Sequence, residues 1–298
     1  TLRSRGIGCN SKDLPAGRQG SIAMELFRNE ITELKEYTLG VYPSRIKLNQ
    51  NENPYELPAA IKQQILEKVA AVEWSRYPAF VPQRQIEKVA EFAGWRSDGV
   101  LIGNGSNELL QLLITCLLER GKSVVISQPT FTLYKLLARS LGATVCEVPM
   151  LKSFAFDVDR IIATANERNA SMIILCSPNN PTGTILSRDE IRKILESTNA
   201  LLALDEAYVQ FARETQIALL HDYERLVVFQ TFSKAMGAAG LRFGYLLAQP
   251  SIVKNLAKVK LPYNVNIFTL IAAEVLIENW QAIRPAVETI VRERERVY

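Results

Sequence analysis

The residues best suited to covalent chemistry lie in one stretch, where a lysine and an arginine bracket a run of small residues. Lys234 follows an apolar run over residues 226–230 and has two hydroxyl residues, Thr231 and Ser233, just before it. A lysine among small apolar neighbours beyond a strand end is placed for a lowered pKa and for attack on a carbonyl. Arg242 and the glycines between allow cations and backbone to approach an anion closely. The alternative is a surface lysine whose charged end reaches the solvent.

A carboxylate stands at the end of a second apolar run. Asp205 follows residues 201–204, and a charge at the end of a buried strand is costly unless it meets a cation. Tyr208, three residues further on, can point into the same pocket. The competing interpretation is that Asp205 only caps a helix.

A glycine-rich loop follows a third apolar run. Residues 103–108 read Gly-Asn-Gly-Ser-Asn-Glu and lead into an apolar helical pattern. The two glycines free the backbone to curl, and the unpaired N–H groups of a helix start suit a phosphate. A plain strand-to-helix turn, capped by Ser106 or Asn107, explains the same residues.

Two more loops carry candidate ligand contacts. Phe131 lies just beyond a strand end, where it can stack on a planar heterocycle or simply join the core. Residues 177–183 read Ser-Pro-Asn-Asn-Pro-Thr-Gly, and the two prolines stiffen the chain on either side of the asparagines. The amide of Asn180 is then held where a hydrogen-bond donor is needed, unless the loop is only a turn.

The elements that must position these residues follow from alternating apolar runs and helical patterns. Strands are predicted at residues 100–102, 123–127, 144–148, 171–177, 201–205, 226–231 and 243–248. Helices are predicted at residues 108–118, 133–141, 160–166, 188–197, 268–278 and 286–297. Apolar strands separated by helices indicate an α/β fold, a mostly parallel sheet sandwiched by helices. Ligands bind at the carboxyl ends of such strands, which is where the polar residues stand.

Taken in order, these motifs resemble the fold type I pyridoxal-phosphate aminotransferases, and most closely the histidinol-phosphate aminotransferase group. The likeness is carried by residues 177–183, the tetrapeptide Asp205-Glu206-Ala207-Tyr208 and residues 233–242. Residues 49–54 and the tripeptide at 76–78 also match opening motifs of that group. The similarity runs from about residue 47 to residue 298. It implies the large cofactor domain of that fold, with an incomplete small domain.

The resemblance implies pyridoxal 5'-phosphate as the cofactor and Lys234, Asp205 and Tyr208 as the catalytic residues. Lys234 would hold the cofactor as a Schiff base and move the substrate proton, while Asp205 would keep the ring nitrogen protonated. Asn180 and Tyr208 would bond the ring hydroxyl oxygen, and Phe131 would stack on the ring. The cofactor phosphate would be held by Gly105, Ser106, Asn107, Thr231, Ser233 and Arg242.

The implied reaction moves the amino group of L-histidinol phosphate to 2-oxoglutarate, in histidine biosynthesis. Tyr77 resembles the tyrosine that reaches the phosphate of the neighbouring subunit's cofactor, which implies a homodimer with shared sites. Two other reactions stay open, namely decarboxylation of threonine phosphate and aromatic or broad-range transamination. A hypothesis of another class is a non-catalytic truncated dimer partner, because the family's C-terminal substrate-binding arginine has no counterpart. Residues Arg292, Arg294 and Arg296 do not match its motif.

The chain is predicted to have four parts. Residues 1–23 are expected to be a non-native or disordered extension, and residues 24–46 an N-terminal helix or arm of the small domain. Residues 47–280 would form the large cofactor-binding domain. Residues 281–298 would begin a C-terminal small domain, because the last helical pattern breaks off without a capping signal.

Composition argues against several other classes. The 298 residues carry 35 basic and 31 acidic side chains, and no basic stretch is interleaved with aromatics, so nucleic acid is not an expected partner. The apolar runs are strand-sized rather than ~20 residues long, which indicates no membrane span and a cytoplasmic location. Cys116, Cys146 and Cys176 lie in apolar runs typical of the core. The single histidine, His221, is expected in a surface loop and excludes a histidine-cluster metal site, so no metal is predicted.

Overall fold

The computed structural model describes residues 26–38, 40, 43–212 and 214–297, and divides the chain into two compact units, residues 1–41 and 42–298. In the first unit the described helix is α2 (Asn29–Thr32), which covers four residues of the segment 24–46 predicted as an N-terminal helix or arm. The proposed extension at residues 1–23 lies outside the described residues. All other elements belong to the second unit.

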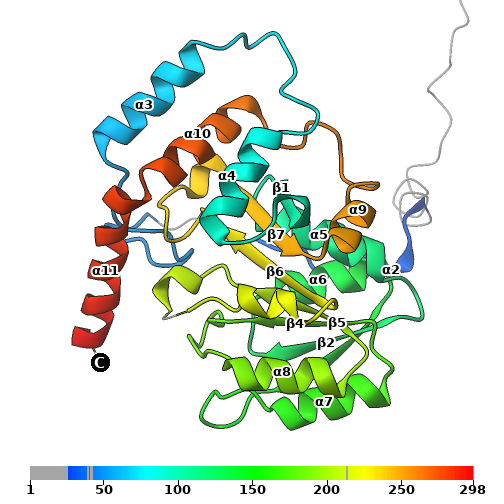
Figure 1. Cartoon of the computed structure of the whole chain (residues 1–298). Coiled ribbons are helices and arrows are strands. Elements are labelled where there is room, and N and C mark those ends of the chain that lie inside the picture. Colours follow the sequence, from blue (N-terminus) through cyan, green and yellow to red (C-terminus); the bar gives the residue numbers. More distant parts are fainter. Residues whose placement is uncertain (1–25, 39, 41–42, 213, 298) are drawn as a thin grey trace, which may run out of the picture. The chain divides into compact units, whose positions relative to one another are not determined.

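A seven-stranded sheet forms the centre of the second unit (Figure 1). Its order is β1-β7-β6-β5-β4-β2-β3. The strands are β1 (Val100–Gly103), β2 (Ser123–Gln128), β3 (Thr144–Pro149), β4 (Met172–Cys176), β5 (Leu201–Asp205), β6 (Leu226–Thr231) and β7 (Gly244–Ala248). β3, β2, β4, β5 and β6 run parallel, while β7 is antiparallel to both β6 and β1. The predicted mostly parallel α/β fold is confirmed.

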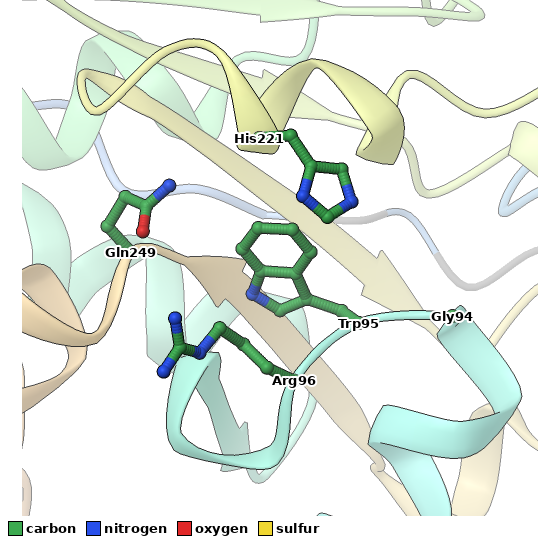
Figure 2. Close-up of a pocket in the computed structure, with 5 residues that line it drawn as sticks. All are labelled: Gly94, Trp95, Arg96, His221 and Gln249. Atoms are coloured by element: carbon green, nitrogen blue, oxygen red, sulfur yellow. The ribbon is translucent and has the colours of Figure 1, made fainter.

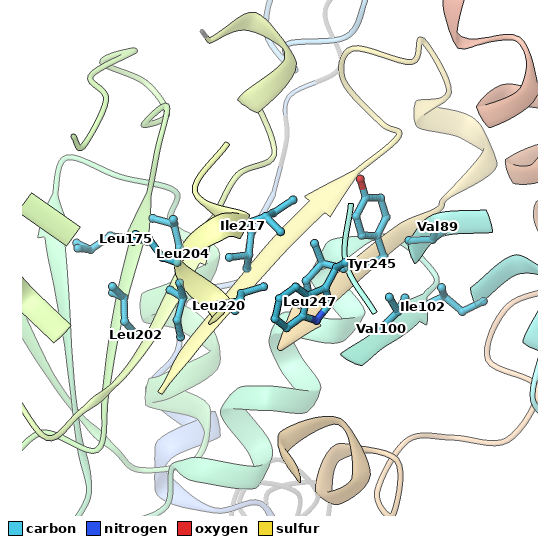
Figure 3. Packing of buried hydrophobic residues seen from close by; sticks show 14 of the residues in the cluster. Val89, Val100, Ile102, Leu175, Leu202, Leu204, Ile217, Leu220, Tyr245 and Leu247 are labelled. Carbon is cyan, nitrogen blue, oxygen red and sulfur yellow. The ribbon is translucent and has the colours of Figure 1, made fainter. Parts of the chain in front are cut away.

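Side chains alternate between two apolar layers along each strand. On β5, Leu202 and Leu204 belong to one buried cluster and Ala203 to the other. Figure 3 shows the first cluster, in which Leu202, Leu204, Tyr245 and Leu247 lie along one face of the sheet. Each fully buried leucine stabilises the fold by about 1.5–3 kcal/mol. The sheet is therefore covered on both faces, and polar side chains gather at strand ends.

Helices cover each face. The cluster that contains Ala203 packs against α5 (Ser106–Leu117), α6 (Leu133–Ser140) and α9 (Pro250–Leu256). We call this side of the sheet the α5/α6 face. The opposite side, the α7/α8 face, is covered by α4 (Gln83–Ala93), α7 (Val158–Glu167), α8 (Arg188–Ser197) and α10 (Ile267–Glu278). Ile61 of α3 (Ala59–Ala70) and Ile283 of α11 (Trp280–Val297) join the same cluster. Short 3-10 turns complete the unit: η1 (Ser97–Gly99), η2 (Val209–Phe211), η3 (Ile217–His221) and η4 (Ala239–Leu241).

The structure contains helices that the sequence pattern does not predict. α3 buries only Ile61 and Val69 and α9 only one residue, so their apolar stripes are too sparse to show as a period, whereas the buried residues of α4 do recur at helical spacing and were missed. α11 starts six residues before its predicted start and runs through Pro285. Pro285 is the sixth residue of α11, beyond the first turn, so it removes one intrahelical hydrogen-bond donor and the helix continues through it.

The predicted core placement of the cysteines is wrong for Cys116, which is exposed, and holds fully only for Cys176. Cys116 lies on the outer side of α5, because an apolar sequence neighbourhood on a helix still has a solvent face. His221 is exposed as expected but ends η3, where its ring packs edge-on against Trp95. In the described part of the chain, no helix has the length and apolar character needed to cross a bilayer.

Candidate functional site

Lys234, Asp205 and Tyr208 lie together at the carboxyl edge of the sheet. Asp205 ends β5, Lys234 follows the end of the neighbouring strand β6, and the Lys234 Nζ lies 5.6 Å from the centroid of the Tyr208 ring. Asp205 and Lys234 each shift the pKa of the other through their charges, yet they form no ion pair. A ligand that contacts both groups would therefore lie between the amine and the carboxylate.

Asp205 is held by two donors in a buried environment. Its Oδ2 accepts a hydrogen bond of 2.6 Å from the Tyr134 hydroxyl, and its Oδ1 accepts one of 3.0 Å from the Ala207 N–H. Burial raises the pKa of Asp205, while these two bonds and the positive charge of Lys234 act in the opposite direction. A cationic ligand atom beside the carboxylate would stabilise its charged form further.

The amine of Lys234 is partly buried and donates a hydrogen bond of 2.7 Å to the Gln50 carbonyl. Burial lowers the pKa of Lys234, and the nearby Arg242 lowers it as well, while Glu52 and Asp205 raise it. A lowered pKa increases the fraction of neutral amine at neutral pH, which is the form that attacks carbonyls or accepts protons. Lys234 thus has the electrostatic setting of a reactive lysine.

An anion cradle is formed where the start of α5 meets the segment after β6. Gly105 has φ +83°, and a Cβ built there would collide with the Arg242 guanidinium. Arg242 Nη1 donates to the Ser233 Oγ at 3.0 Å and to the Ala239 carbonyl at 3.1 Å. Both partners are neutral, so the guanidinium keeps its full positive charge. Glycine at 105 is therefore required for the α5 amides and Arg242 to face one another.

Hydroxyl groups complete this cradle. The Thr231 Oγ1 donates to the Phe243 carbonyl at 3.1 Å and lies 3.0 Å from the Ser233 Oγ. Gly244 lies opposite Thr231 in the β6–β7 pairing, and a Cβ at Gly244 would collide with the Ser106 backbone. The structure thus brings Gly105, Ser106, Thr231, Ser233 and Arg242 together. A planar ligand with a carbonyl, a basic ring nitrogen and an anionic group matches this set of amine, carboxylate and cradle.

Phe131 and Asn180 border the site from neighbouring strand ends. The Phe131 ring packs edge-on against Tyr134, the donor to Asp205, with ring centroids 5.6 Å apart. Asn180 lies in the loop that follows β4, whose last residue, Cys176, pairs with Asp205 in the sheet. The buried Asn179 supports the loop through bonds to Thr130 and Thr182, while the neighbouring Asn180 is partly exposed.

Asn107 and Tyr77 are not brought into these contacts. Asn107 is exposed on the first turn of α5. Tyr77 is 79% exposed and stacks on Tyr263, with ring centroids 4.5 Å apart. Within one chain, Tyr77 therefore lies on a surface and contacts none of the residues at the strand ends.

Several residues at the site were not predicted as ligands. The Asn51 amide donates to the Tyr208 hydroxyl at 3.1 Å, and the Asn53 amide donates to the Ala235 carbonyl at 3.0 Å. Gln50 supplies the carbonyl that accepts from Lys234. The signal for all three was the motif at residues 49–54, which had been assigned to the family but given no role. Tyr134 lies one turn beyond Phe131, inside the apolar pattern of α6, so nothing marked it.

A separate pocket of about 350 Å³ lies at the opposite edge of the sheet, lined by Gly94, Trp95, Arg96, His221 and Gln249 (Figure 2). It adjoins the amino ends of β1 and β6, whereas Lys234 follows the carboxyl end of β6. Its polar groups are already engaged, because Arg96 pairs with Asp98 and the Trp95 Nε1 donates to the Ala248 carbonyl. We assign it no chemistry.

Comparison with known proteins resolves the family. The sequence model described as aminotransferase class I and II matches residues 43–297. The chain belongs to this family. A histidinol-phosphate aminotransferase of Chlorobium phaeobacteroides is 38% identical over 275 residues, which cover 92% of this chain and 76% of the relative. One of Pyrococcus furiosus is 37% identical over 268 residues, covering 90% and 78%.

Solved structures of aminotransferases share this fold. Histidinol-phosphate aminotransferase of Sinorhizobium meliloti, determined in complex with pyridoxal-5'-phosphate, superposes with a TM-score of 0.84 at 22% identity, covering 91% of this chain and 76% of that one. The L-threonine-O-3-phosphate decarboxylase of Porphyromonas gingivalis gives a TM-score of 0.65 at 26% identity, covering 74% and 65%. The predicted aminotransferase resemblance is confirmed at the level of family and fold.

Proposed function

We propose that this aminotransferase uses pyridoxal 5'-phosphate to move the amino group of L-histidinol phosphate to 2-oxoglutarate, in histidine biosynthesis. The reaction class follows from the family. The donor is supported by relatives of 36–40% identity that carry the histidinol-phosphate name. The observation that carries the cofactor assignment is the placement of Lys234 and Asp205 at neighbouring strand ends beside the Arg242 cradle.

The residues present fit this cofactor at each of its polar groups. When bound, pyridoxal phosphate supplies an aldehyde for amines and an electron-withdrawing ring that stabilises negative charge at the substrate Cα. Asp205 would hold a proton on the ring nitrogen, since a cation there offsets the cost of its own burial. Asn180 and Tyr208 would donate to the ring hydroxyl oxygen, and Phe131 would cover one ring face. The phosphate would be held by Gly105, Ser106, Thr231, Ser233 and Arg242, the residues that the cradle brings together.

Lys234 would both anchor the cofactor and transfer protons. Once a substrate amine has displaced it, its free amine can take the proton from the substrate Cα. The lowered pKa of Lys234 favours the neutral form that this step requires. Tyr208, whose ring lies beside the Lys234 amine, would restrict that amine to one side of the site.

An amino-donor screen tests the proposed donor. Purified protein loaded with pyridoxal phosphate is mixed with one amino donor at a time, and the conversion of the cofactor spectrum to the amino form is followed. L-histidinol phosphate should convert the cofactor fastest among histidinol phosphate, phosphothreonine, phenylalanine and glutamate. Faster conversion by phenylalanine would favour a broad-range aminotransferase, and carbon dioxide release from phosphothreonine would favour the decarboxylase.

We infer further that two copies share their sites through Tyr77. Trp74, Tyr77 and Phe80 are 64%, 79% and 64% exposed, and Tyr77 and Phe80 both pack on Tyr263. Large aromatic side chains grouped at a surface are typical of protein interfaces. A second copy would bury this aromatic surface and bring Tyr77 to the phosphate of its partner's cofactor.

Hybrid dimers test the shared site. Lys234→Ala and Tyr77→Ala subunits are each expected to be weakly active alone. Mixed after unfolding and refolding together, they should regain activity, because the Tyr77→Ala subunit keeps its lysine and receives an intact tyrosine from its partner. A mixture no more active than its parents would show that Tyr77 does not act across subunits, and a monomer in light scattering would exclude the dimer.

A further inference from the structure

A buried acid stands directly beside Asp205 but points to the other face of the sheet. Glu206 is 1% exposed and follows the last residue of β5. Alternation along the strand places Asp205 on the α5/α6 face, with Tyr134, and Glu206 on the α7/α8 face. The assigned roles of the cofactor site do not use it. A carboxyl buried to this degree is costly unless every lone pair is matched.

Three donors surround the Glu206 carboxyl. Its Oε2 accepts hydrogen bonds from the Thr215 hydroxyl at 2.6 Å and from the Gln230 Nε2 at 2.8 Å. Its Oε1 accepts from the Gln216 N–H at 2.7 Å. The row continues across the sheet, because the Tyr245 hydroxyl donates to the Gln230 Oε1 at 2.5 Å. We call Thr215, Gln216, Glu206, Gln230 and Tyr245 the back row.

Each strand that contributes to the back row also contributes to the cofactor site at the adjacent residue. On β5 the pair is Asp205 and Glu206, and on β6 it is Thr231 and Gln230. On β7, Tyr245 pairs with Gln230 in register, while its neighbour Gly244 pairs with Thr231. Figure 3 shows the Tyr245 ring rising from β7 on the α7/α8 face. A shift of one strand end would therefore move both a back-row residue and a site residue.

Glu206 also fixes the segment that carries Tyr208. Its backbone N–H donates to the Phe229 carbonyl at 2.9 Å, and its carbonyl accepts from the Val209 N–H at 3.0 Å. Its side chain reaches Thr215 and Gln216, which lie just before η3. The chain on either side of Tyr208 is thus tied to one residue, through its backbone and its carboxyl group.

The structure assigns Glu206 as a positioning residue of the cofactor site. Through Gln230 and Tyr245 it holds the ends of β5, β6 and β7 in the register that lets Asp205 and Thr231 meet one ligand and lets Gly244 approach the Ser106 backbone. This inference rests on the proposed cofactor. A purely apolar residue would fill the same space at lower cost, as Leu202 and Leu204 do on this face. The hydrogen-bonded connections of the row, and not its burial alone, are what the site requires.

Two substitutions separate the hydrogen bonds from the charge. Glu206→Ala leaves three buried donors without an acceptor, so the strand ends lose their link. Glu206→Gln keeps an acceptor for Thr215 or Gln216. Its amide can also donate to Gln230 if that side chain turns over, because the Tyr245 hydroxyl can accept as well as donate. The glutamine variant should therefore preserve the register and the alanine variant should not.

The matched control is Glu274→Ala. Glu274 is 6% exposed on α10, where it accepts from Gln85 and pairs with Arg84 at 2.9 Å. It is thus another buried, bonded glutamate, but none of its partners stands beside a residue of the cofactor site. Loss of stability alone should be similar in Glu206→Ala and Glu274→Ala.

The experiment titrates each cofactor-free variant with pyridoxal phosphate and follows its absorption, and measures backbone hydrogen exchange without cofactor. Glu206→Ala should bind the cofactor about tenfold more weakly than the parent protein, with faster exchange at residues 205–207, 229–232 and 243–246. Glu206→Gln and Glu274→Ala should bind within about threefold of the parent. If Glu206→Ala does not fold, Tyr245→Phe, which keeps the ring and loses one donor, should show the same pattern more weakly.

Several results would overturn the inference. Parent-like cofactor affinity in Glu206→Ala would do so, as would an equal loss of affinity in Glu274→Ala. If the parent protein binds no pyridoxal phosphate, the proposed function fails, and the exchange measurement still decides the register claim on its own. Unchanged exchange at the three strand ends in Glu206→Ala would then reject it.

Discussion

The two faces of the sheet differ at its carboxyl edge. On the α5/α6 face, Lys234 and Arg242 are cations whose hydrogen-bond partners are neutral carbonyl and hydroxyl groups. On the α7/α8 face, the back row matches a buried carboxyl with three donors and continues to Tyr245. The α5/α6 face thus has positive charge available for a ligand, whereas on the α7/α8 face the buried carboxyl already has its hydrogen-bond donors. The difference agrees with the inference that hydrogen bonds on the α7/α8 face fix the strand ends that carry the ligand-binding residues of the α5/α6 face.

The largest effect, on turnover, should come from substitution of Lys234 on the α5/α6 face. Lys234→Ala removes both the amine that anchors the cofactor and the base at the substrate Cα. Turnover should fall by at least about 10²–10⁴-fold, the contribution of a positioned proton-transfer group. Borohydride reduction followed by peptide mass spectrometry should find cofactor attached at Lys234 in the parent and nowhere in the variant.

A lysine away from the strand ends provides the control. Lys258 is exposed and donates to the Asn255 side chain, so Lys258→Ala should retain parent activity and labelling. Attachment of the cofactor to another lysine in Lys234→Ala would contradict the assignment. The cofactor site would then not be the one that contains Lys234, and the comparison of the two faces would not apply.

Arg242 should give the next largest effect, on cofactor affinity. Arg242→Gln removes a guanidinium whose charged hydrogen bonds to a phosphate contribute about 1.5–3 kcal/mol each, so the Kd for pyridoxal phosphate should rise about 10–100-fold. Glutamine must adopt the same left-handed backbone, φ +54°, as arginine does, so the change isolates the charged group. Absorption titration measures this Kd. The control is Arg96→Gln, because Arg96 lines the pocket at the opposite edge of the sheet and should leave the Kd unchanged.

The sequence made part of this comparison predictable. Asp205, Lys234 and Arg242 follow apolar runs, and parallel strands bring their carboxyl ends to one edge, so their proximity follows from the pattern alone. Tyr134 and Asn51 could not be predicted this way. Tyr134 is masked by the apolar period of α6, and Asn51 meets Tyr208 across 157 residues of sequence.

The back row was hidden for a related reason. In the sequence, Glu206 stands out only as part of the tetrapeptide at residues 205–208. Gln230 and Tyr245 are polar interruptions of apolar strand patterns, and nothing in the sequence connects them with Glu206. Their connection depends on which residues face each other across three strands, and that register is fixed only by the folded sheet. The sparse apolar stripe of α3 hid that helix, since it is stabilised by tertiary packing.

Tyr134 tests the comparison at a buried position on the α5/α6 face, because its hydroxyl donates to Asp205. Tyr134→Phe keeps the buried ring and removes the 2.6 Å hydrogen bond to Oδ2. A hydrogen bond to a charged group contributes about 1.5–3 kcal/mol, so cofactor affinity should fall about tenfold. The same bond lowers the pKa of Asp205, so the loss should be greatest at low pH, where the carboxyl protonates more readily.

Absorption titrations between pH 5 and pH 8 measure the effect of Tyr134→Phe. Tyr223→Phe is the control, because the Tyr223 hydroxyl also donates to a carboxylate, that of Glu196, but at the surface. Equal effects of the two substitutions would mean that Asp205 does not depend on its buried donor.

The smallest effect should come from Glu206 on the α7/α8 face, as a dependence of folding stability on pH. Burial raises the pKa of Glu206 from its usual 4.5 to about 7, against the opposing effect of its three hydrogen bonds, while the charge of Asp205 adds to the increase. Among the described titratable groups, Asp205 and Tyr245 are the ones whose charges interact with it. The folded protein thus favours the protonated carboxyl. The corresponding stability is fully present below about pH 4.5 and is lost as the pH rises to about 7.

Glu206→Gln resembles the protonated carboxyl at every pH, so it isolates this contribution. The Tm of the parent relative to that of Glu206→Gln should decrease by a few degrees between pH 5 and pH 8, because one unit of pKa corresponds to about 1.4 kcal/mol. Other groups titrate alike in the two proteins and cancel in the difference. A difference in Tm that stays constant with pH would mean that Glu206 keeps one charge state throughout. The two faces would then differ in geometry but not in how they respond to protons.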